Sequence, residues 1–316
     1  MKNQPRAPVK QHTMPNFYLK RFSDTNSMVW VYDREKKELR KQPTKDTTIE
    51  RDFYTFHTKD GDKNLSIEID LFAKSIEERA NRVIEKLEKG TLPNLPEERR
   101  DLCEFVTTQY LRTTAFRRDV SYSYEQFSKI MLRMSFFNEE RAQKTIENFE
   151  RNTGQKFDIT PEEAMKFIKE DKYKIEVPKE YHLTFMLESF KEFYGIFFRL
   201  NWVFVRSARN NLFLTSDNPF SVMRFGAVPL QPYHISLAEL TLPLSSRICL
   251  YMHKYGGVTF WQDADDKIIN NFNLRTIFFS DRFIISRKRK QLLNLVKKSK
   301  IDKMPRKPGI KIESPF

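Results

Sequence analysis

Gln11-His12-Thr13-Met14-Pro15-Asn16-Phe17-Tyr18-Leu19-Lys20-Arg21-Phe22 is the stretch that sets the organisation of this 316-residue chain. It places a histidine, a proline and three aromatic residues within twelve positions, in a part of the chain where loose polar sequence is usual. We therefore expect this N-terminal arm to dock into the body of the protein. Docking would carry His12 to a defined place, and histidine is the side chain whose unperturbed pKa lies near neutrality.

Beyond the arm, hydrophobic periodicity predicts strands, then a block of helices, then strands again. Capping residues, first-turn acids and a proline at the first helical position support several of the helices. The strands are expected at 28–33, 51–58, 202–205, 212–215, 240–242, 247–251 and 276–287, the last as one strand or a pair. The helices are expected at 67–89, 96–118 with a continuation to 137, 138–151, 160–170, 178–200, 265–274 and 292–296.

This order predicts an α+β fold with a mixed, mostly antiparallel sheet built from N- and C-terminal segments and a large helical insertion. In chain order, the arm and first strands occupy 1–65, the helical block 66–200, the completing strands 201–290 and a basic tail 291–316. The same order of elements can also be described as two domains.

Charge is concentrated at the two ends of the chain. The net charge is +14, yet residues 1–21 hold five Lys or Arg and no acid, and 287–311 hold eleven against Asp302. The body between them is neutral. Cationic ends can draw a chain toward RNA or DNA by counterion release, or can be solvated surface.

Several classes of protein are excluded or disfavoured. No GxGxxG, P-loop, GxSxG or HExxH motif occurs, which argues against dinucleotide, nucleoside triphosphate, α/β-hydrolase and zinc-protease sites. No apolar run is long enough to cross a membrane, and the basic N-terminus lacks the apolar core of a secretory signal. Cys103 and Cys249 lie far apart in apolar runs, which is typical of reduced thiols in the cytoplasm. No metal site is predicted, a cofactor is left open, and so is the oligomeric state.

Two polar groups stand out on the helix expected at 96–118. Gln109 lies near the centre of its apolar face, and Arg112 flanks it. Burying an amide or a guanidinium without partners costs several kcal/mol. These side chains therefore either belong to an internal hydrogen-bonded network or line a pocket.

Polar turns follow two of the later strands. Thr215-Ser216-Asp217-Asn218-Pro219 ends an apolar strand, where Asp217 could orient a base, bind a metal or hold a substrate hydroxyl. Leu242-Pro243-Leu244-Ser245-Ser246-Arg247 has the form of a strand entry with a Ser/Arg turn. Asn270 and Asn271 lie on the helix expected at 265–274, where an amide on the buried side needs partners.

Taken together, these motifs resemble the bacterial family filed as domain of unknown function (DUF) 4238. The resemblance rests on segments spread over nearly the whole chain, and it implies kinship of fold rather than a function. Ser246 stands where the family usually has a proline. The matching residues are His12, Pro15, Phe17, Tyr18, Leu19 and Phe22; Trp30 to Asp33; Gln109, Arg112 and Thr113; Trp202; Thr215 to Pro219; and Pro243 to Ser245.

Two hypotheses of function follow. In the first, the protein cleaves RNA or DNA, as a toxin or phage-defence effector, in one cleft where His12 acts as general acid/base and Asp217, Gln109 and Arg112 assist. Substrate contacts would then come from Tyr18, Thr113, Ser216, Asn218 and Asn271. In the second, the protein binds nucleic acid or another partner without catalysis, and the same residues form a structural polar network.

Overall fold

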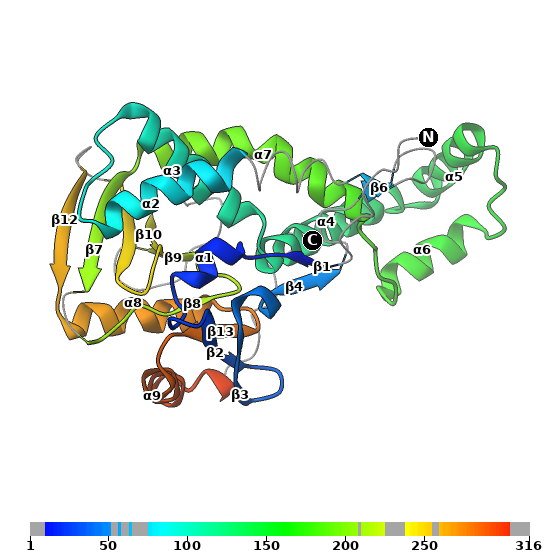
Figure 1. Cartoon of the computed structure of the whole chain (residues 1–316). Coiled ribbons are helices and arrows are strands. Elements are labelled where there is room, and N and C mark those ends of the chain that lie inside the picture. Colours follow the sequence, from blue (N-terminus) through cyan, green and yellow to red (C-terminus); the bar gives the residue numbers. More distant parts are fainter. Residues whose placement is uncertain are drawn as a thin grey trace, which may run out of the picture. The chain divides into compact units, whose positions relative to one another are not determined.

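The computed structural model describes residues 10–51, 56–57, 63–64, 75–207, 210–224, 238–254 and 259–303. The chain divides into two compact units (Figure 1). The larger unit comprises the chain up to Arg117 and from Leu183 to Arg306, and the helical unit contains Arg118–His182. Most of the strand expected at 51–58 and the end of the basic tail lie outside the described residues.

A five-stranded sheet forms the centre of the larger unit. Its strands follow the order β12 (Thr259–Ala264), β7 (Asn201–Ser207), β11 (Ile248–His253), β10 (Ala238–Pro243) and β9 (Ser221–Arg224). Neighbouring strands are antiparallel, except that β12 runs parallel to β7.

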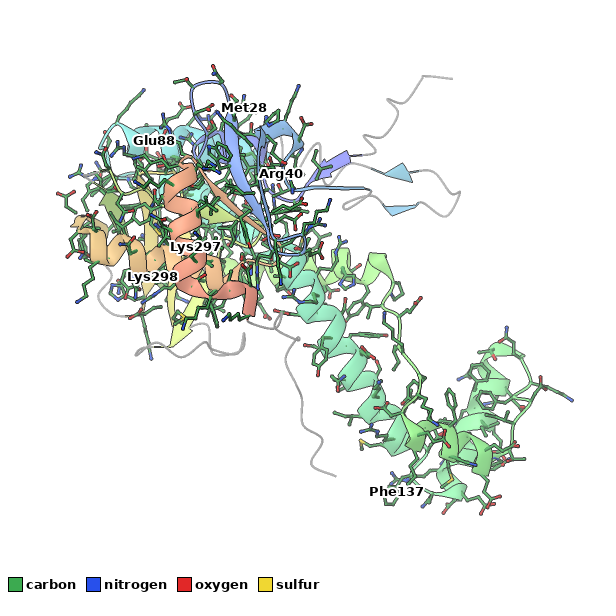
Figure 2. The ribbon with its side chains drawn as sticks, turned by 90° about the horizontal axis from the view of Figure 1, so that it is seen from below. Met28, Arg40, Glu88, Phe137, Lys297 and Lys298 are labelled. Carbon is green, nitrogen blue, oxygen red and sulfur yellow. The ribbon has the colours of Figure 1, made fainter. Side chains whose placement is uncertain are left out.

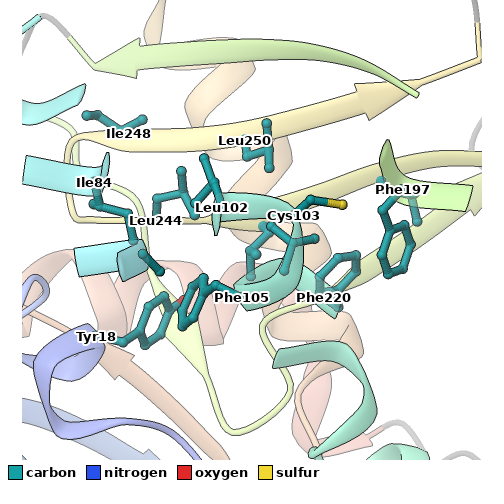
Figure 3. Close-up of a cluster of buried hydrophobic side chains, with 14 of the residues drawn as sticks. Tyr18, Ile84, Leu102, Cys103, Phe105, Phe197, Phe220, Leu244, Ile248 and Leu250 are labelled. Atoms are coloured by element: carbon teal, nitrogen blue, oxygen red, sulfur yellow. The ribbon is translucent and has the colours of Figure 1, made fainter. Parts of the chain in front are cut away.

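Alternation along β7 gives this sheet two apolar faces, because successive side chains of a strand point to opposite sides. Trp202 and Phe204 pack in the main core with α2 (Glu78–Glu88), α3 (Pro96–Leu111) and the part of α7 (Lys179–Arg199) that lies in the larger unit. Figure 3 shows Leu102 and Phe105 of α3 beside Leu244 and Leu250 in this core. On the opposite face, Val203 and Val205 pack with α8 (Asp266–Phe279).

A second sheet joins the two ends of the fold. It has the order β3 (Glu38–Pro43), β2 (Met28–Asp33), β13 (Phe283–Ser286) and β8 (Thr215–Ser216), and all its pairs are antiparallel. Helix α9 (Arg289–Ser299) covers one face through Leu292, Leu295 and Val296, which pack with Tyr32 and Ile284.

The N-terminal arm docks as its composition predicts. Strand β1 (Lys10–His12) pairs with β4 (Ile49–Arg51), and a single helical turn, α1 (Asn16–Lys20), follows. Met14, Tyr18, Leu19 and Phe22 are completely buried. The remaining short elements are η1 (Thr44–Asp46), the pair β5 (Phe56–His57) and β6 (Lys63–Asn64), and η4 (Ile301–Lys303).

The helical unit holds most of α4 (Thr114–Ser135), α5 (Glu139–Thr153), α6 (Pro161–Glu170) and the first residues of α7. Asn138 caps α5 by accepting a hydrogen bond from the Arg141 amide at 2.9 Å. Thr160 and Glu163 form a capping box at the start of α6. Within α5 and α6 only Ala142, Ile146, Ala164 and Ile168 are buried, so this unit has a small core.

The α+β class, the pairing of N-terminal with C-terminal strands and the intervening helices are confirmed. The strands form two larger sheets, however, rather than the single expected one. The prediction of a strand from Thr276 was wrong, because α8 continues to Phe279 and β13 begins only at Phe283. β-branched and aromatic residues favour a strand there, but burial of Thr276 and Ile277 on the helix overrides that local preference.

Candidate functional site

His12 lies at the end of β1 and is half-buried. Its Nε2 atom is 2.9 Å from the carbonyl oxygen of Lys45, so one ring nitrogen contacts the backbone of η1. Thr13, the next residue, donates its amide to the carbonyl of Thr48 at 3.0 Å. These contacts place His12 on the seam between the arm and the 44–48 segment.

Gln109 and Arg112 of the α3 region meet the N-terminal arm. The Gln109 Nε2 atom lies 2.8 Å from the sulfur of Met14, and Arg112 donates from Nε to the carbonyl of Thr13 at 2.7 Å. A second guanidinium nitrogen of Arg112 pairs with Glu77 at 2.9 Å. Both Gln109 and Arg112 are buried, which confirms that these groups lie inside the protein.

Thr113 lies between α3 and α4. Its hydroxyl donates to the carbonyl of Tyr110 and accepts from the amide of Phe116, each at 3.1 Å. A threonine that accepts a backbone N–H three residues on satisfies one of the free donors at the start of a helix. Thr113 therefore shapes the α3–α4 junction.

Tyr18 ties the arm to both sheets. Its hydroxyl lies 2.7 Å from Oγ1 of Thr215 and donates to the carbonyl of Pro243 at 2.6 Å. Burial raises the pKa of this phenol far above its ordinary value, so it stays protonated. Figure 3 shows the Tyr18 ring beside Phe105.

Asp217 is buried and holds the start of β13. Its carboxylate accepts hydrogen bonds from the amides of Asp281, Arg282 and Phe283 at 2.7–2.9 Å. Burial raises the pKa of Asp217 to about 7, and Asp281 acts in the same direction, while the three amides lower it. Asp217 directly follows β8, and its side chain thus attaches the end of that strand to the start of β13, the neighbouring strand.

The neighbours of Asp217 are also engaged within the fold. Ser216 is buried, and its hydroxyl accepts from the Asn218 amide at 3.2 Å. The Asn218 side chain donates to the carbonyl of Phe279 at 2.9 Å. Asn271 lies apart, exposed on α8, where its oxygen accepts from Arg275 at 2.9 Å.

The structure therefore sets Gln109 and Arg112 against Met14 and Thr13 of the arm. His12, the preceding residue, contacts the Lys45 carbonyl instead. Tyr18 reaches the strand that leads into Asp217. Gln109, Arg112 and Asp217 contact protein groups from buried positions. Among the described residues, no three His, Cys, Asp or Glu side chains lie close enough to share a metal ion. A catalytic role for these residues stays a prediction.

An open pocket lies elsewhere in the larger unit. It has a volume of about 820 Å³, and none of the nine sequence-predicted site residues lines it. Its walls come from α1 and the residues after it, the end of α2, the end of β7, the β10–β11 turn and the residue Arg287 just before α9. The lining residues are Phe17, Lys20, Arg21, Ser23, Asn81, Leu87, Glu88, Lys89, Gly90, Arg206, Ser207, Ser245, Ser246, Arg247, Ile248 and Arg287.

This lining is strongly cationic. Six of its side chains are Lys or Arg, and Glu88 is its one carboxylate. Arg21 pairs with Glu88 and donates to the side-chain oxygen of Asn81 at 2.6 Å, which holds its guanidinium against the end of α2. We refer to it as the cationic pocket.

The β10–β11 turn, which the sequence singled out, forms one wall of the cationic pocket. The Ser245 hydroxyl accepts from the amides of Arg247 and Ile248, at 3.1 and 3.2 Å. The Ser246 amide donates to the carbonyl of Arg21 at 3.1 Å, a bond that a proline at this position lacks the N–H to make. This bond attaches the turn to the arm.

Sequence reasoning missed the other walls of this pocket. Lys20 and Arg21 lie inside the arm motif, but Lys89, Arg206 and Arg287 belong to three distant segments with no shared pattern. Their clustering depends on tertiary structure. The only signal in the sequence was the excess of positive charge in its end segments.

Fold and site thus define an α+β protein with two sheets, a docked N-terminal arm and a cationic pocket. The family model described as "Protein of unknown function (DUF4238)" matches residues 10–290, and the chain belongs to that family. Searches of curated proteins and of solved structures gave no match. No helix in the described part of the chain has both the length and the apolar character needed to cross a membrane.

Proposed function

We propose that this protein binds nucleic acid through a cationic face on and around α9. The observation that carries this proposal is a set of exposed Lys and Arg side chains on α9 and on the residues just before and after it. They are Arg287, Arg289, Lys290, Lys297, Lys298, Lys300 and Lys303. Lys297 and Lys298 are labelled on this helix in Figure 2.

The placement of these charges supports a polyanionic partner. The first turn of α9 has no acidic residue and carries Arg289 and Lys290. The positive end of a helix dipole disfavours cations by a few tenths of a kcal/mol or more. Helix stability therefore gives no reason for Arg289 and Lys290 at this end, although it favours Lys297 and Lys298 in the last turn. Phosphate groups would be attracted both to the first-turn side chains and to the helix end.

The second sequence hypothesis fits this proposal. Gln109, Arg112 and Asp217 make hydrogen bonds inside the protein and act as a structural polar network. The same binding experiment is also the first test of cleavage by His12, because a nuclease must bind its substrate before it cleaves it.

Deleting the basic segment is an unsuitable test, because Leu292, Leu295 and Val296 of α9 belong to the core. Charge removal by point substitution leaves that core intact. We expect the triple variant K297Q/K298Q/K300Q to keep its fold and to bind more weakly. Fluorescence anisotropy with labelled duplex DNA, repeated over a range of salt concentrations, measures the change.

For duplex DNA the slope of log K against log salt changes by about 0.9 for each phosphate that the protein no longer neutralises. The triple variant is therefore expected to flatten that slope by about two to three. The matched control K144Q/K166Q/K169Q removes the same charge from exposed sites in the helical unit and is expected to bind like the native protein. Equal weakening in both variants, or no salt-dependent binding of DNA or single-stranded RNA, would refute the proposal.

Gel analysis of the same nucleic acids after incubation tests cleavage. Cleavage that is abolished in His12→Ala, with binding retained, would favour the enzyme hypothesis. Intact nucleic acid under all conditions, together with salt-dependent binding, favours a binding protein.

A further inference from the structure

We infer that the cationic pocket is a binding site for the phosphate monoester of a nucleotide. The nucleotide can be the end of a nucleic-acid strand or a free mononucleotide, because both present the same dianionic group. The inference deepens the proposed function. It rests on that function only where the phosphate belongs to the end of a nucleic-acid strand.

Charge balance in the pocket is the first argument. Glu88 neutralises Arg21, and Asp263 forms two hydrogen bonds with Arg206, at 2.8 and 3.3 Å. Within the described residues, no carboxylate pairs with three further lining cations, Lys20, Lys89 and Arg287. Like charges gathered in one concave site repel each other unless an anion enters, and a concave site of one sign raises the local concentration of such anions.

A buried donor on Arg21 is the second argument. The side chain of Arg21 is only 8% exposed, and its outer nitrogens contact Glu88 and Asn81. Its Nε–H is buried and has no hydrogen-bond partner in the described part of the protein. An unsatisfied buried donor costs about 1–3 kcal/mol, and an oxyanion drawn into the pocket is a suitable acceptor.

The remaining lining fits the rest of a nucleotide. Serine side chains at Ser23 and Ser246 add neutral polar groups, while the half-buried Phe17 adds apolar surface for a base or sugar. About 820 Å³ lies within the range of pockets that enclose small organic ligands. Arg287 belongs both to this pocket and to the cationic face of α9, so a strand along α9 can place its terminal phosphate in the pocket.

Two ligand pairs that differ only in the phosphate test the inference. The first pair is one labelled oligonucleotide with a phosphate or a hydroxyl at its 5′ end, followed by anisotropy, with a second set modified at the 3′ end. The second pair is AMP and adenosine, followed by calorimetry. We expect the phosphate to raise affinity by on the order of tenfold in at least one pair.

The variant K20Q/K89Q removes two exposed pocket cations and is expected to lose this phosphate preference. The control K144Q/K166Q, which removes two exposed lysines of the helical unit, is expected to keep it. K297Q/K298Q/K300Q is expected to weaken both oligonucleotides together and keep their ratio. Thermal melting checks that every variant is folded.

Equal affinity within every pair, or a preference that K20Q/K89Q retains, overturns the inference. If the hydroxyl-ended oligonucleotide still binds in a salt-dependent way in that case, the α9 proposal is retained. Binding of AMP without any binding of oligonucleotides has the opposite meaning: the pocket is confirmed with a free nucleotide as its ligand, and the α9 proposal fails.

Discussion

Arg112 is a polar residue that the sequence singled out for a possible site, and in the structure it makes hydrogen bonds within the fold. A guanidinium on an apolar helix face predicted either a pocket or an internal network, and the structure gives it the Thr13 carbonyl and Glu77 as partners. The choice between the two depended on where the N-terminal arm docks. That contact joins residues about a hundred positions apart and leaves no periodic signal in the chain.

Replacing Arg112 tests this structural role. Arg112→Met leaves a buried carbonyl and the Glu77 carboxylate without their partner, so we expect the free energy of unfolding to fall by about 2–4 kcal/mol. Chemical denaturation measures it. Arg100→Met, an exposed site on the same helix, should change stability by less than about 0.5 kcal/mol. Similar destabilisation of both variants would contradict the assignment.

Asp33 gives the protein an acid-sensitive contact. Burial raises the pKa of Asp33, but hydrogen bonds from Arg282, the Lys36 amide and Arg40 outweigh it and hold the pKa at about 2. An unfolded aspartate takes up its proton near pH 4. The contribution of Asp33 is therefore fully present above about pH 4 and is lost as the pH falls toward 2.

We expect the free energy of unfolding of the native protein to decline as the pH falls from 4 to 2. For Asp33→Asn, the slope of that free energy against pH is expected to be smaller by the equivalent of about one proton. Denaturation at a series of pH values gives the slopes. Asp158→Asn controls for the removal of a carboxylate, since Asp158 is exposed. Parallel curves for Asp33→Asn and the native protein would exclude this role for Asp33.

At the scale of elements, segments with a clear apolar period were predictable and segments with a largely polar sequence were not. The helices α5, α6 and α7 and the strands β2, β7 and β11 follow the sequence pattern closely. Strands β3 and β12 were missed. Strand β3 has a largely polar sequence and only half-buried or exposed residues, so no alternation marks it.

The α3–α4 junction lies within a segment that the sequence predicted as one helix reaching about Arg118. Thr113 interrupts it by accepting the amide of Phe116. Thr113→Ala removes that acceptor, so we expect a loss of about 1 kcal/mol in the free energy of unfolding.

Thr113→Ser keeps the hydroxyl and serves as the matched variant. Chemical denaturation of both proteins measures the difference. A serine variant as unstable as the alanine variant would indicate that the methyl group of Thr113, rather than its cap, stabilises the junction.

At the scale of the whole molecule, the two units differ in how much apolar surface they bury. The helical unit leaves Phe127, Phe137 and Phe167 exposed, and α5 and α6 each bury only one alanine and one isoleucine. The larger unit holds three apolar clusters. Regions that bury little apolar surface open at a lower free energy than a large core does.

Hydrogen exchange followed by mass spectrometry tests this difference. We expect amides in α5 and α6 to exchange faster than those in β7 and β11 by at least about a hundredfold. Strands within the larger unit provide the internal reference. Equal protection of the two units would mean that they unfold as one.

The pairing of β2 with β13 has a consequence for synthesis. These partner strands are separated by about 250 positions in the chain, so a ribosome must deliver most of the polypeptide before the four-stranded sheet can close. Until then the apolar residues of β2 in the nascent chain lack their neighbouring strand β13. Such long-range closure slows folding and exposes aggregation-prone intermediates. We therefore expect chaperones to bind the nascent chain during translation.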